Sequence, residues 1–353
     1  MDFSLTEAQR ELAALTRRIV GDRVSTDRLR AAEAAGSRFD RELWGVLAET
    51  GILGVDDLLE QCSVLIELGR GLAPVPYLPT VAVAGPALAR FGSPELRLRW
   101  LAPALAGQTV LAAALAHPDV RPPAAAGRSG GGWQLTGEVS AVPAAPVADA
   151  LLVETVAGVF LVSRDTPGVT VTRQPTTDFD DAGLLLLDGV LVPEEQRLDA
   201  PSGSDDVAGW MRARAAVAGA AHQLGVLEAA LELTAEHART RVQFGRPIGA
   251  FQAVSQRLAD AYVDVRAVEL TLWAAAYALA EDEDPQSAVA TAKFWTAEAG
   301  HRVAHTLVHV HGGTGIDVEH PAHRYFLAAK RAEFDGGGAT AALLELGTAL
   351  AVE

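Results

Sequence analysis

Residues 241–252 read RVQFGRPIGAFQ, and this stretch separates two long segments in which apolar residues have helical spacing. The first segment runs from Trp210 to Arg239, and the second begins at about residue 251. In both, apolar residues recur at steps of three and four, as they do on one face of an α-helix. Two glycines and a proline interrupt the pattern, because both residue types disfavour a helix interior. The sequence therefore predicts two long helices joined by a turn.

Further helices are predicted beyond this pair. The second long helix extends to about residue 280, and three more are expected at 286–310, at 321–335 and from about 338. Helices of this length bury their apolar faces against one another, so four or five of them favour a bundle. We expect a helical bundle over residues 204–353.

The middle of the chain has a different composition. Residues 113–203 contain nine of the 18 prolines, namely Pro118, Pro122, Pro123, Pro143, Pro146, Pro167, Pro175, Pro193 and Pro201. Each would destabilise a helix interior by roughly 3 kcal/mol. Short apolar runs alternate with turn residues there, and Thr166-Pro167-Gly168 is typical of a tight turn. The segment predicts a compact antiparallel β domain of about six to eight short strands.

The N-terminal third shows helical spacing again. A capping box is expected at Ser4 and Glu7, ahead of apolar positions from Leu5 to Ile19. Further helices are predicted at 40–50, 57–71, 80–91 and 95–106. The predicted fold is mainly α with a central β domain. Its three domains are a helical domain at 1–112, the β domain at 113–203 and the bundle at 204–353.

Composition argues against several classes of protein. The single cysteine, Cys62, excludes an internal disulfide and a site built from several thiolates. The net charge of −16 opposes binding to phosphate backbones. No apolar run approaches the roughly 18 residues of a membrane helix, and the N-terminus lacks the apolar core of a signal peptide. We expect a cytoplasmic protein that binds neither nucleic acid nor membranes.

The turn between the long helices carries residues suited to a nucleotide. Arg241 offers charge for a diphosphate, Phe244 offers a ring for stacking, and Gln252 offers an amide for hydrogen bonds. From the residues alone, a purely structural helix hairpin is the favoured interpretation of the stretch.

A second stretch, His309-Val310-His311-Gly312-Gly313, ends a predicted helix. Paired glycines let a backbone approach a ligand closely, but they also serve as a helix C-cap. No Gly-Lys-Ser/Thr follows, so the stretch is not a phosphate-binding P-loop. His301, His305 and His309 recur every four residues, as metal ligands on one helix face would. Packed or solvated histidines are the favoured interpretation, and no metal is expected.

Four stretches occur in order after the helical and β segments: RVQFGRPIGAFQ (241–252), Ala292-Lys293, VHVHGGTGI (308–316) and HRYFLAAKR (323–331). Together they resemble the acyl-CoA dehydrogenase family, most strongly over about residues 205–335. The likeness is weaker in MDFSLTEAQRELAALTRRIV, LTGE and LLLLDGVLVPEEQRL. The resemblance implies an N-terminal helical domain, a middle β-barrel or sandwich domain and a C-terminal four-helix bundle.

The resemblance also implies FAD as cofactor and an acyl-CoA thioester as substrate. In this family a carboxylate removes the α proton while the flavin N5 accepts the β hydride. Each FAD lies between two subunits, and an electron-transfer flavoprotein is the expected electron acceptor. By this resemblance the adenosine-diphosphate half of the site falls to Arg241, Phe244, Gln252, His309, Gly312 and Gly313, with His309 where the family usually has glutamine.

The half that cradles the flavin ring departs from the family pattern. The family's T-E-P…G-S-D segment reads Ala116-His117-Pro118-Asp119-Val120 here, and its W-I-S/T-N segment reads Val139-Ser140-Ala141-Val142-Pro143. The hydroxyls and the indole expected to contact the flavin are absent from both.

The residue at the position of the catalytic base also departs from the family pattern. Asp335 takes its place if the chain is aligned on Phe-x-Gly, whereas Gly336 does if it is aligned on Lys330. The other position used by relatives falls near Ala215, which has no carboxylate. Aspartate is one methylene shorter than glutamate, and an error of about 1 Å can cost roughly 10²-fold in rate. We favour the interpretation that Asp335 is not an effective base.

These departures lead to three hypotheses. The first is the partner subunit of a heteromeric, α2β2-like acyl-CoA dehydrogenase, of the kind found in actinobacterial sterol side-chain degradation. The second is a self-sufficient homo-oligomeric dehydrogenase of acyl-CoA or acyl-carrier-protein thioesters that uses Asp335. The third is a non-catalytic scaffold that binds neither FAD nor thioester.

Overall fold

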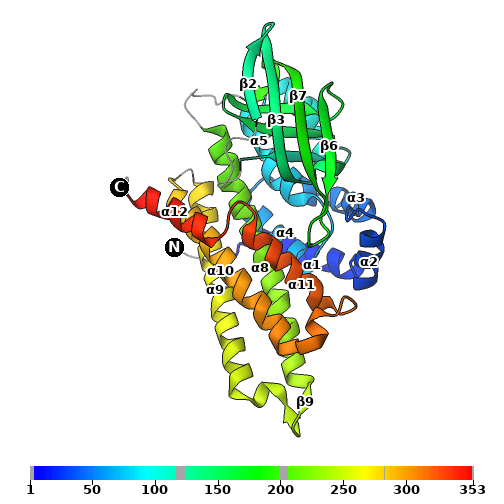
Figure 1. Ribbon diagram of the computed structural model, residues 1–353, viewed down its shortest axis with the longest axis vertical. Helices are drawn as coiled ribbons and strands as arrows, with labels where there is room; N and C mark the ends of the chain where they lie inside the picture. Colours follow the sequence, from blue (N-terminus) through cyan, green and yellow to red (C-terminus); the bar gives the residue numbers. More distant parts are fainter. Residues whose placement is uncertain (1–3, 117–123, 199–205, 282, 352–353) are drawn as a thin grey trace. The chain divides into compact units, whose positions relative to one another are not determined.

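The computed structural model describes residues 4–116, 124–198, 206–281 and 283–351, and it confirms a mainly α fold with a central sheet (Figure 1). The chain divides into two compact units. One unit comprises residues 1–28, 58–73 and 216–353, and the other comprises 29–57 and 74–215. The first is therefore built largely from the two ends of the chain, and the second from its middle.

The predicted long helices are all present, with ends within about three residues of the expected ones. They are α8 (Val207–Thr240), α9 (Gln252–Ala280), α10 (Gln286–His311), α11 (Pro321–Phe334) and α12 (Ala339–Leu350). Helix α10 packs against α9, α11 and α12. Two N-terminal helices, α1 (Glu7–Arg23) and α4 (Leu58–Arg70), pack on each other in the same unit.

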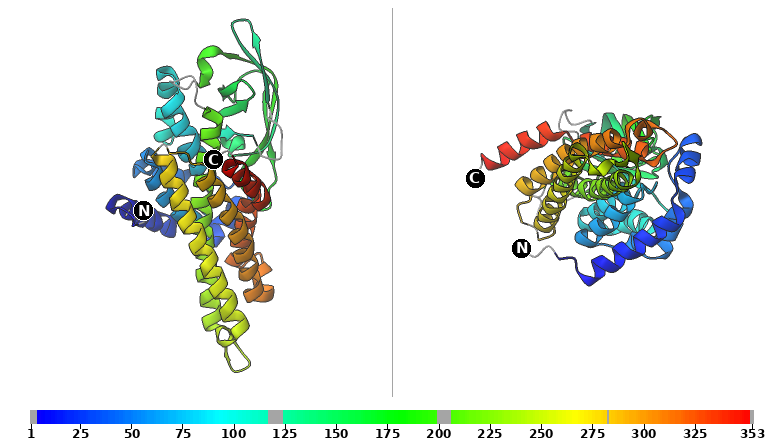
Figure 2. Two further views of the ribbon diagram at one scale, coloured as in Figure 1. Left: turned by 90° about the vertical axis from the view of Figure 1, so that its left-hand side faces the viewer. Right: turned by 90° about the horizontal axis from the view of Figure 1, so that it is seen from below.

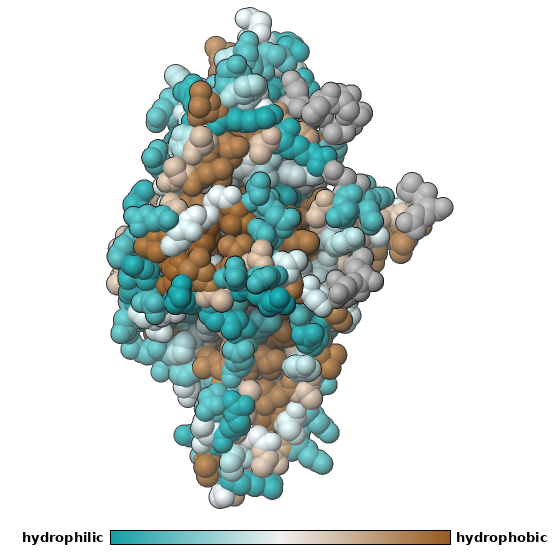
Figure 3. Space-filling model, turned by 180° about the vertical axis from the view of Figure 1, so that it is seen from behind, coloured by the Kyte–Doolittle hydropathy of each residue, from teal (hydrophilic) through white to brown (hydrophobic). Residues whose placement is uncertain are grey.

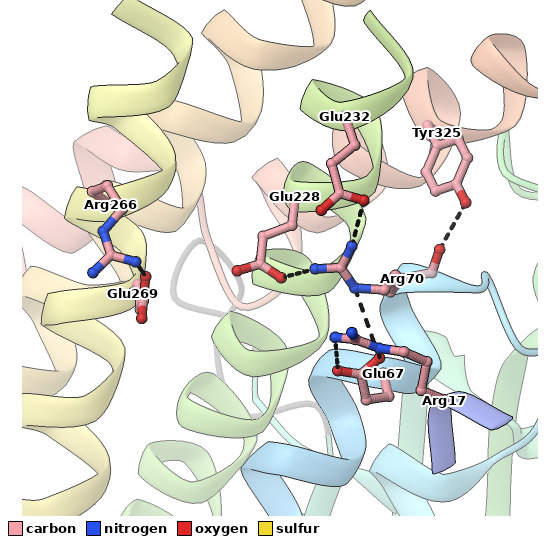
Figure 4. Close-up of polar contacts among 8 residues, drawn as sticks. All are labelled: Arg17, Glu67, Arg70, Glu228, Glu232, Arg266, Glu269 and Tyr325. Carbon is pink, nitrogen blue, oxygen red and sulfur yellow. Dashed lines mark hydrogen bonds and ion pairs between the residues drawn. The ribbon is translucent and has the colours of Figure 1, made fainter. Parts of the chain in front are cut away.

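An ion-pair cluster centred on Arg70 joins α4 to α8 (Figure 4). The Arg70 guanidinium contacts Glu228 and lies 2.7 Å from Glu232 Oε2. Beside it, Glu67 accepts two hydrogen bonds of 2.8 Å from Arg17 of α1. Burial raises the pKa of the Glu228 carboxyl, and the charge of Arg70 opposes that rise. Each of these carboxylates has a guanidinium partner, so loss of one arginine would leave a carboxylate between the helices uncompensated.

The capping box of α1 lies two residues beyond the predicted one. Thr6 is the N-cap: its hydroxyl accepts from the Gln9 backbone, and the Gln9 side chain accepts from the Thr6 N–H at 2.7 Å. The prediction of Ser4 and Glu7 was therefore wrong. Both pairs have the required spacing, and in the structure only the pair that begins at Thr6 forms the two capping-box hydrogen bonds.

The other N-terminal helices are more broken than expected. Helices α3 (Arg41–Glu49) and α4 match their predictions, whereas α2 (Thr26–Ala34) and the short η1 (Ile52–Gly54) were not predicted. The helix expected at 80–91 consists of η2 (Leu78–Ala84) and α5 (Gly85–Phe91), and the one at 95–106 consists of α6 (Pro94–Leu96), η3 (Arg97–Leu101) and α7 (Ala102–Leu105). In η2 and η3 the turns widen just ahead of Pro86 and Pro103, which cannot donate a backbone hydrogen bond.

In the described part of the chain the central sheet has eight strands: β1 (Leu111–Ala114), β2 (Ala124–Ser129), β3 (Gly132–Pro143), β4 (Ala150–Thr155), β5 (Gly158–Ser163), β6 (Val169–Gln174), β7 (Ala182–Pro193) and β8 (Arg197–Leu198). Their order is β6-β7-β3-β2-β4-β5-β8, with β1 beside β4. The expected turn is confirmed, because Val169 N donates to Thr166 O at 3.0 Å and Gly168 has φ 91°.

Two expectations for this sheet were wrong. The sheet is not wholly antiparallel, because β1 pairs with β4 in parallel, Leu111 opposite Ala150. The strands are not all short either, since β3 and β7 have 12 residues each. Strands β4 and β5 are buried on both faces: Leu151 and Phe160 belong to one core cluster, and Leu152 and Leu161 to another. A strand covered on both faces can accept a parallel neighbour without exposing it to water.

Candidate functional site

The stretch 241–252 forms a small β-hairpin at the tip of the bundle, labelled β9 in Figure 1. Strands β9 (Val242–Gln243) and β10 (Arg246–Pro247) pair antiparallel, and the short helix η6 (Ile248–Ala250) leads into α9. The two residues at the tip, Phe244 and Gly245, have φ of 53° and 79°. Positive φ at both central residues is typical of a type I′ turn.

Phe244 has an unusual conformation for its size. Its side chain is 93 % exposed, although a phenyl ring normally gains stability by burial. Positive φ in a bulky residue costs on the order of 1–3 kcal/mol and is concentrated at functional sites. The Phe251 ring lies edge-on to it at 6.2 Å, and Arg246 covers Phe251 at 4.2 Å. The turn thus presents an aromatic ring to whatever binds at this end of the bundle.

Arg241 and Gln252 lie at the two ends of the same hairpin. Ile248 N donates to Arg241 O at 2.8 Å, which closes the loop between them. Both side chains are exposed, and neither the guanidinium nor the amide forms a hydrogen bond to any residue in the described part of the chain. The fold therefore brings Arg241, Phe244 and Gln252 to one end of the bundle with their polar groups available.

The glycine stretch forms the C-cap of α10, which is one of the two roles predicted for it. Gly312 has φ 61°, and its N–H donates to Val308 O. It opens the short helix η7 (Gly312–Ile316). His309 and Gly313 are exposed, and a Cβ added at Gly312 or Gly313 would meet no atom within 4 Å. Open space beside two glycines is the condition for close backbone approach by a ligand.

Two histidines that the sequence did not single out connect these segments. His237, four residues before Arg241, stacks on the buried His311 with ring centroids 4.3 Å apart. Burial lowers the pKa of both imidazoles, and Arg241 lowers that of His237 further. Neutral rings can stack in this way without charge repulsion. The stack places the end of α8 beside the end of α10, so the hairpin and the glycine stretch share one end of the bundle.

Asp335 lies away from the hairpin and the glycine stretch. It is the C-cap of α11, and its carboxylate accepts from Arg331 Nε at 2.6 Å. Lys293 of α10 donates to the neighbouring carbonyl of Ala332 at 3.1 Å. Sixteen residues separate Lys293 from His309, or about 24 Å of helix at 1.5 Å per residue. The structure does not bring Asp335 together with the candidate nucleotide residues.

The two segments that depart from the flavin-cradling pattern bond to their own chain. Ala116 N donates to the buried carboxylate of Glu154 at 2.7 Å, and Arg212 pairs with that carboxylate. Residues 117–120 lie outside the described residues. In the second segment β3 bulges, and Ala141 N donates to the Gln174 side chain at 2.6 Å. The backbone donors of Ala116 and Ala141 are thus engaged by side chains of this chain.

Within the described ranges, no group of three histidine, cysteine or carboxylate side chains is arranged to hold a metal ion. The His301 and His305 rings contact each other at 4.5 Å, and His305 also meets Phe326. None of the helices in the described residues combines the length and the apolar character needed to cross a bilayer.

Two known protein families match most of this sequence. Residues 207–349 match the family described as "Acyl-CoA dehydrogenase, C-terminal domain", and residues 6–108 match "Acyl-CoA dehydrogenase, N-terminal domain". The chain belongs to the acyl-CoA dehydrogenase family. FAD is the cofactor of this family, as the sequence predicted.

Three similar proteins extend the family assignment. "Acyl-CoA dehydrogenase FadE27" of Mycobacterium tuberculosis is 49% identical and covers 99% of both chains. The solved ChsE4–ChsE5 complex from Mycobacterium tuberculosis contains a chain that is 49% identical, with TM-score 0.94 and 99% of both chains covered. A second structure, described as a Tcur3481–Tcur3483 steroid ACAD variant, contains a chain with 39% identity, TM-score 0.90 and 98% coverage of both chains. The first of these structures is a complex of two components, and the second is named for two components.

The donor set at the tip of the bundle fits part of this cofactor. A guanidinium, an exposed aromatic ring and an amide suit a diphosphate, a purine face and a purine edge, respectively. The open space beside Gly312 and Gly313 admits a ligand close to the backbone. These residues offer the donors and the ring that the adenosine-diphosphate half of FAD requires, whereas the backbone donors of Ala116 and Ala141 are already bonded to Glu154 and Gln174.

Proposed function

We propose that this chain is one subunit of a heteromeric, FAD-dependent acyl-CoA dehydrogenase, in which it binds the adenosine-diphosphate half of a FAD whose flavin ring is held by an unlike subunit. The observation that carries the proposal is the exposed Phe244 at positive φ, flanked by the unengaged side chains of Arg241 and Gln252. A ring held in this conformation and exposed to water is consistent with a site completed by a second molecule.

Each residue of the hairpin has a distinct task in this proposal. Arg241 binds the diphosphate, the Phe244 ring contacts the adenine, and Gln252 donates or accepts hydrogen bonds at the purine edge. His309, Gly312 and Gly313 line the approach from the end of α10. When bound, FAD supplies the hydride acceptor for dehydrogenation of the acyl thioester. The base that removes the α proton comes from the unlike subunit, and an electron-transfer flavoprotein is the electron acceptor of the complex.

Two features support an unlike partner over a self-sufficient oligomer. The carboxylate of Asp335 is engaged by Arg331 at the end of α11. The backbone N–H groups of Ala116 and Ala141 are engaged by the side chains of Glu154 and Gln174.

The name of one relative, a steroid ACAD, supports a sterol-derived acyl-CoA as the substrate. A homo-oligomeric dehydrogenase that uses Asp335, and a scaffold that binds neither FAD nor thioester, are the two competing functions.

Purification with and without a partner tests the proposal. The chain expressed alone should contain little flavin. Co-expression with a complementary acyl-CoA dehydrogenase subunit should yield a complex with FAD absorbance and dehydrogenation of acyl-CoA thioesters. A stoichiometric flavin spectrum in the lone chain would establish the homo-oligomeric function instead. A complex in which neither chain binds flavin would support the third function, a non-catalytic scaffold.

A further inference from the structure

Three histidines from three elements meet at the end of the bundle that carries the hairpin. His237 lies on α8, His311 on α10, and His320 is the N-cap of α11. The His237 and His311 rings stack with an interplanar angle of 25°, and the ring centroids of His311 and His320 are 5.3 Å apart. Figure 2 (left) shows the hairpin at the lower tip of the bundle, with the end of α10 above it. The surface of this lower end mixes hydrophilic and apolar side chains (Figure 3).

Only one ring of the stack is placed to carry a charge. His311 is 6 % exposed, whereas His237 is half-buried. The His311 Nδ1 lies 2.8 Å from the carbonyl oxygen of Leu307, so this nitrogen is protonated and donates. The His311 Nε2 has no hydrogen-bond partner in the described part of the chain, and a proton there would leave a buried N–H without an acceptor. A proton gained by the stack therefore goes to His237.

His237 lies beside Arg241. The Arg241 N–H donates to the carbonyl oxygen of His237 at 2.9 Å, which continues the last turn of α8. Side chains four residues apart on a helix are neighbours, with Cβ atoms about 5–6 Å apart. Burial lowers the pKa of His237, and the positive charge of Arg241 lowers it further. An anion bound at Arg241 acts in the opposite direction, because a nearby negative charge favours the imidazolium form.

Several other charged groups surround the stack. They are Glu236 and Arg239 on α8, Arg246 on β10, Arg257 and Asp260 on α9, His309 on α10, Asp317 and Glu319 after η7, and His320, His323 and Arg324 at the start of α11. Glu236 pairs with Arg239, and Asp317 Oδ1 accepts from Glu319 N at 2.9 Å. His320 lowers the pKa of His237 in the same direction as Arg241. Burial, Arg241 and His320 thus all favour a neutral His237 when no anion is bound.

We infer that His237 is a second cationic group of the nucleotide site, which takes up a proton from water as Arg241 binds the FAD diphosphate, while His311 stays neutral and holds the imidazolium ring by stacking. The inference rests on the proposed function and adds a proton to the binding step. Between the pKa of His237 in the free protein and the higher pKa in the loaded one, only the loaded protein holds this proton. Affinity for FAD therefore rises as the pH falls through that window, by at most about tenfold per pH unit.

Titration of FAD into the reconstituted complex tests the inference. The complex of this chain with a complementary acyl-CoA dehydrogenase subunit is stripped of flavin, and FAD is added back at pH 6, 7 and 8 while flavin fluorescence is recorded. Binding should be roughly three- to tenfold tighter at pH 6 than at pH 8. Calorimetry at pH 6.5 in MES and in bis-Tris, which differ in ionisation enthalpy, should show proton uptake on binding.

Three variants separate proton uptake from structural support. His237→Gln should bind FAD with an affinity that no longer changes between pH 6 and 8, and without proton uptake. His311→Phe keeps a stacked ring that cannot titrate, so it should retain the wild-type pH dependence. His305→Gln, the matched control on α10, should retain it as well, because its ring packs against Phe326. Circular dichroism and the thermal midpoint of each complex verify folding.

The outcomes distinguish this inference from the proposed function. If His237 is only structural, His237→Gln weakens binding by the same factor at each pH, and the inference is wrong. It is also wrong if the wild-type complex binds FAD equally at pH 6 and pH 8 without proton uptake, although the proposed function then stands. If the complex binds no FAD at any pH, the proposed function fails. The calorimetric proton count of the wild-type complex remains decisive if His237→Gln does not fold.

Discussion

Gly69 of α4 and Gly225 of α8 each face the backbone of the other helix. A Cβ added at Gly69 would lie 2.0 Å from the carbonyl oxygen of His222, and one added at Gly225 would lie 1.8 Å from that of Ile66. Any side chain at either position would overlap a main-chain atom that cannot move independently. The close approach also holds Arg70, the next residue of α4, near its partners Glu228 and Glu232.

Gly225→Ala should destabilise the protein although alanine is the better helix former. Overpacking of this kind typically costs about 1–3 kcal/mol of unfolding free energy. The matched control is Gly219→Ala on the same helix, where a Cβ meets no atom within 4 Å. It should stabilise by about 0.5–1 kcal/mol. Urea unfolding of both variants measures the difference, and equal effects would contradict close packing at Gly225.

Arg241→Ala should reduce retention of FAD by the reconstituted complex. Loss of a hydrogen bond to a charged group costs about 1.5–3 kcal/mol, or roughly ten- to a hundredfold in affinity. Arg239→Ala is the control, because the Arg239 guanidinium is engaged by Glu236 at 2.6 Å. Flavin absorbance after dialysis measures the FAD that each variant retains. Unchanged retention in Arg241→Ala would mean that the hairpin is only structural.

Asp335→Asn should change turnover of the reconstituted complex by no more than a few-fold. The carboxylate accepts from Arg331, and the side chain is 54 % exposed, so it is held at the end of α11. General-base catalysis supplies roughly 10² to 10⁴ in rate, and a loss of that size is what the competing function predicts. The assay compares turnover at equal flavin content and equal thermal midpoint. A collapse of activity would identify Asp335 as the base.

Lys293 is a buried cation at the C-terminal end of α11. Its Nζ donates to the carbonyl oxygens of Ala332 and Glu333, at 3.1 and 3.4 Å. Burial lowers its pKa from 10.5 to about 8, although the carboxylates of Asp335, Glu333 and Glu345 act in the opposite direction. It satisfies carbonyls that a helix end would otherwise leave without donors.

This lowered pKa predicts how stability varies with pH. Between about pH 8 and 10.5 the unfolded chain binds a proton at Lys293 that the folded chain does not, so stability rises with pH across this window. The gain approaches about 3 kcal/mol, at 1.36 kcal/mol per pKa unit. Lys293→Met should lack this rise, whereas Lys330→Met, at the chain's other lysine, should retain it. Urea unfolding at pH 7.5, 9 and 10 distinguishes them, and parallel curves for wild type and Lys293→Met would refute the prediction.

Much of the architecture follows from local patterns. Apolar spacing alone predicted α8 to α12 with ends within about three residues, because a long amphipathic helix repeats its signal over many turns. The prolines of 113–203 predicted strands because a proline in a helix interior removes a hydrogen bond. The motif around 241–252 predicted the turn, and nucleotide binding by its residues stays a prediction.

Other features depend on contacts between distant residues. Ser4 and Thr6 both satisfy the capping-box spacing, and the register that α1 adopts against α4 is not encoded in either pair. The parallel pairing of β1 with β4 joins residues 39 positions apart, Leu111 with Ala150, and alternation within a strand carries no information about its neighbour's direction.

The sequence by itself determined the helices, the β segment and the residues of the hairpin, because period and turn chemistry are properties of a few neighbouring residues. Only the tertiary structure decided that Phe244 stands in water, that His237 stacks on His311, and that Asp335 is engaged by Arg331. Exposure and proximity depend on how separate elements pack, and no local pattern contains that information.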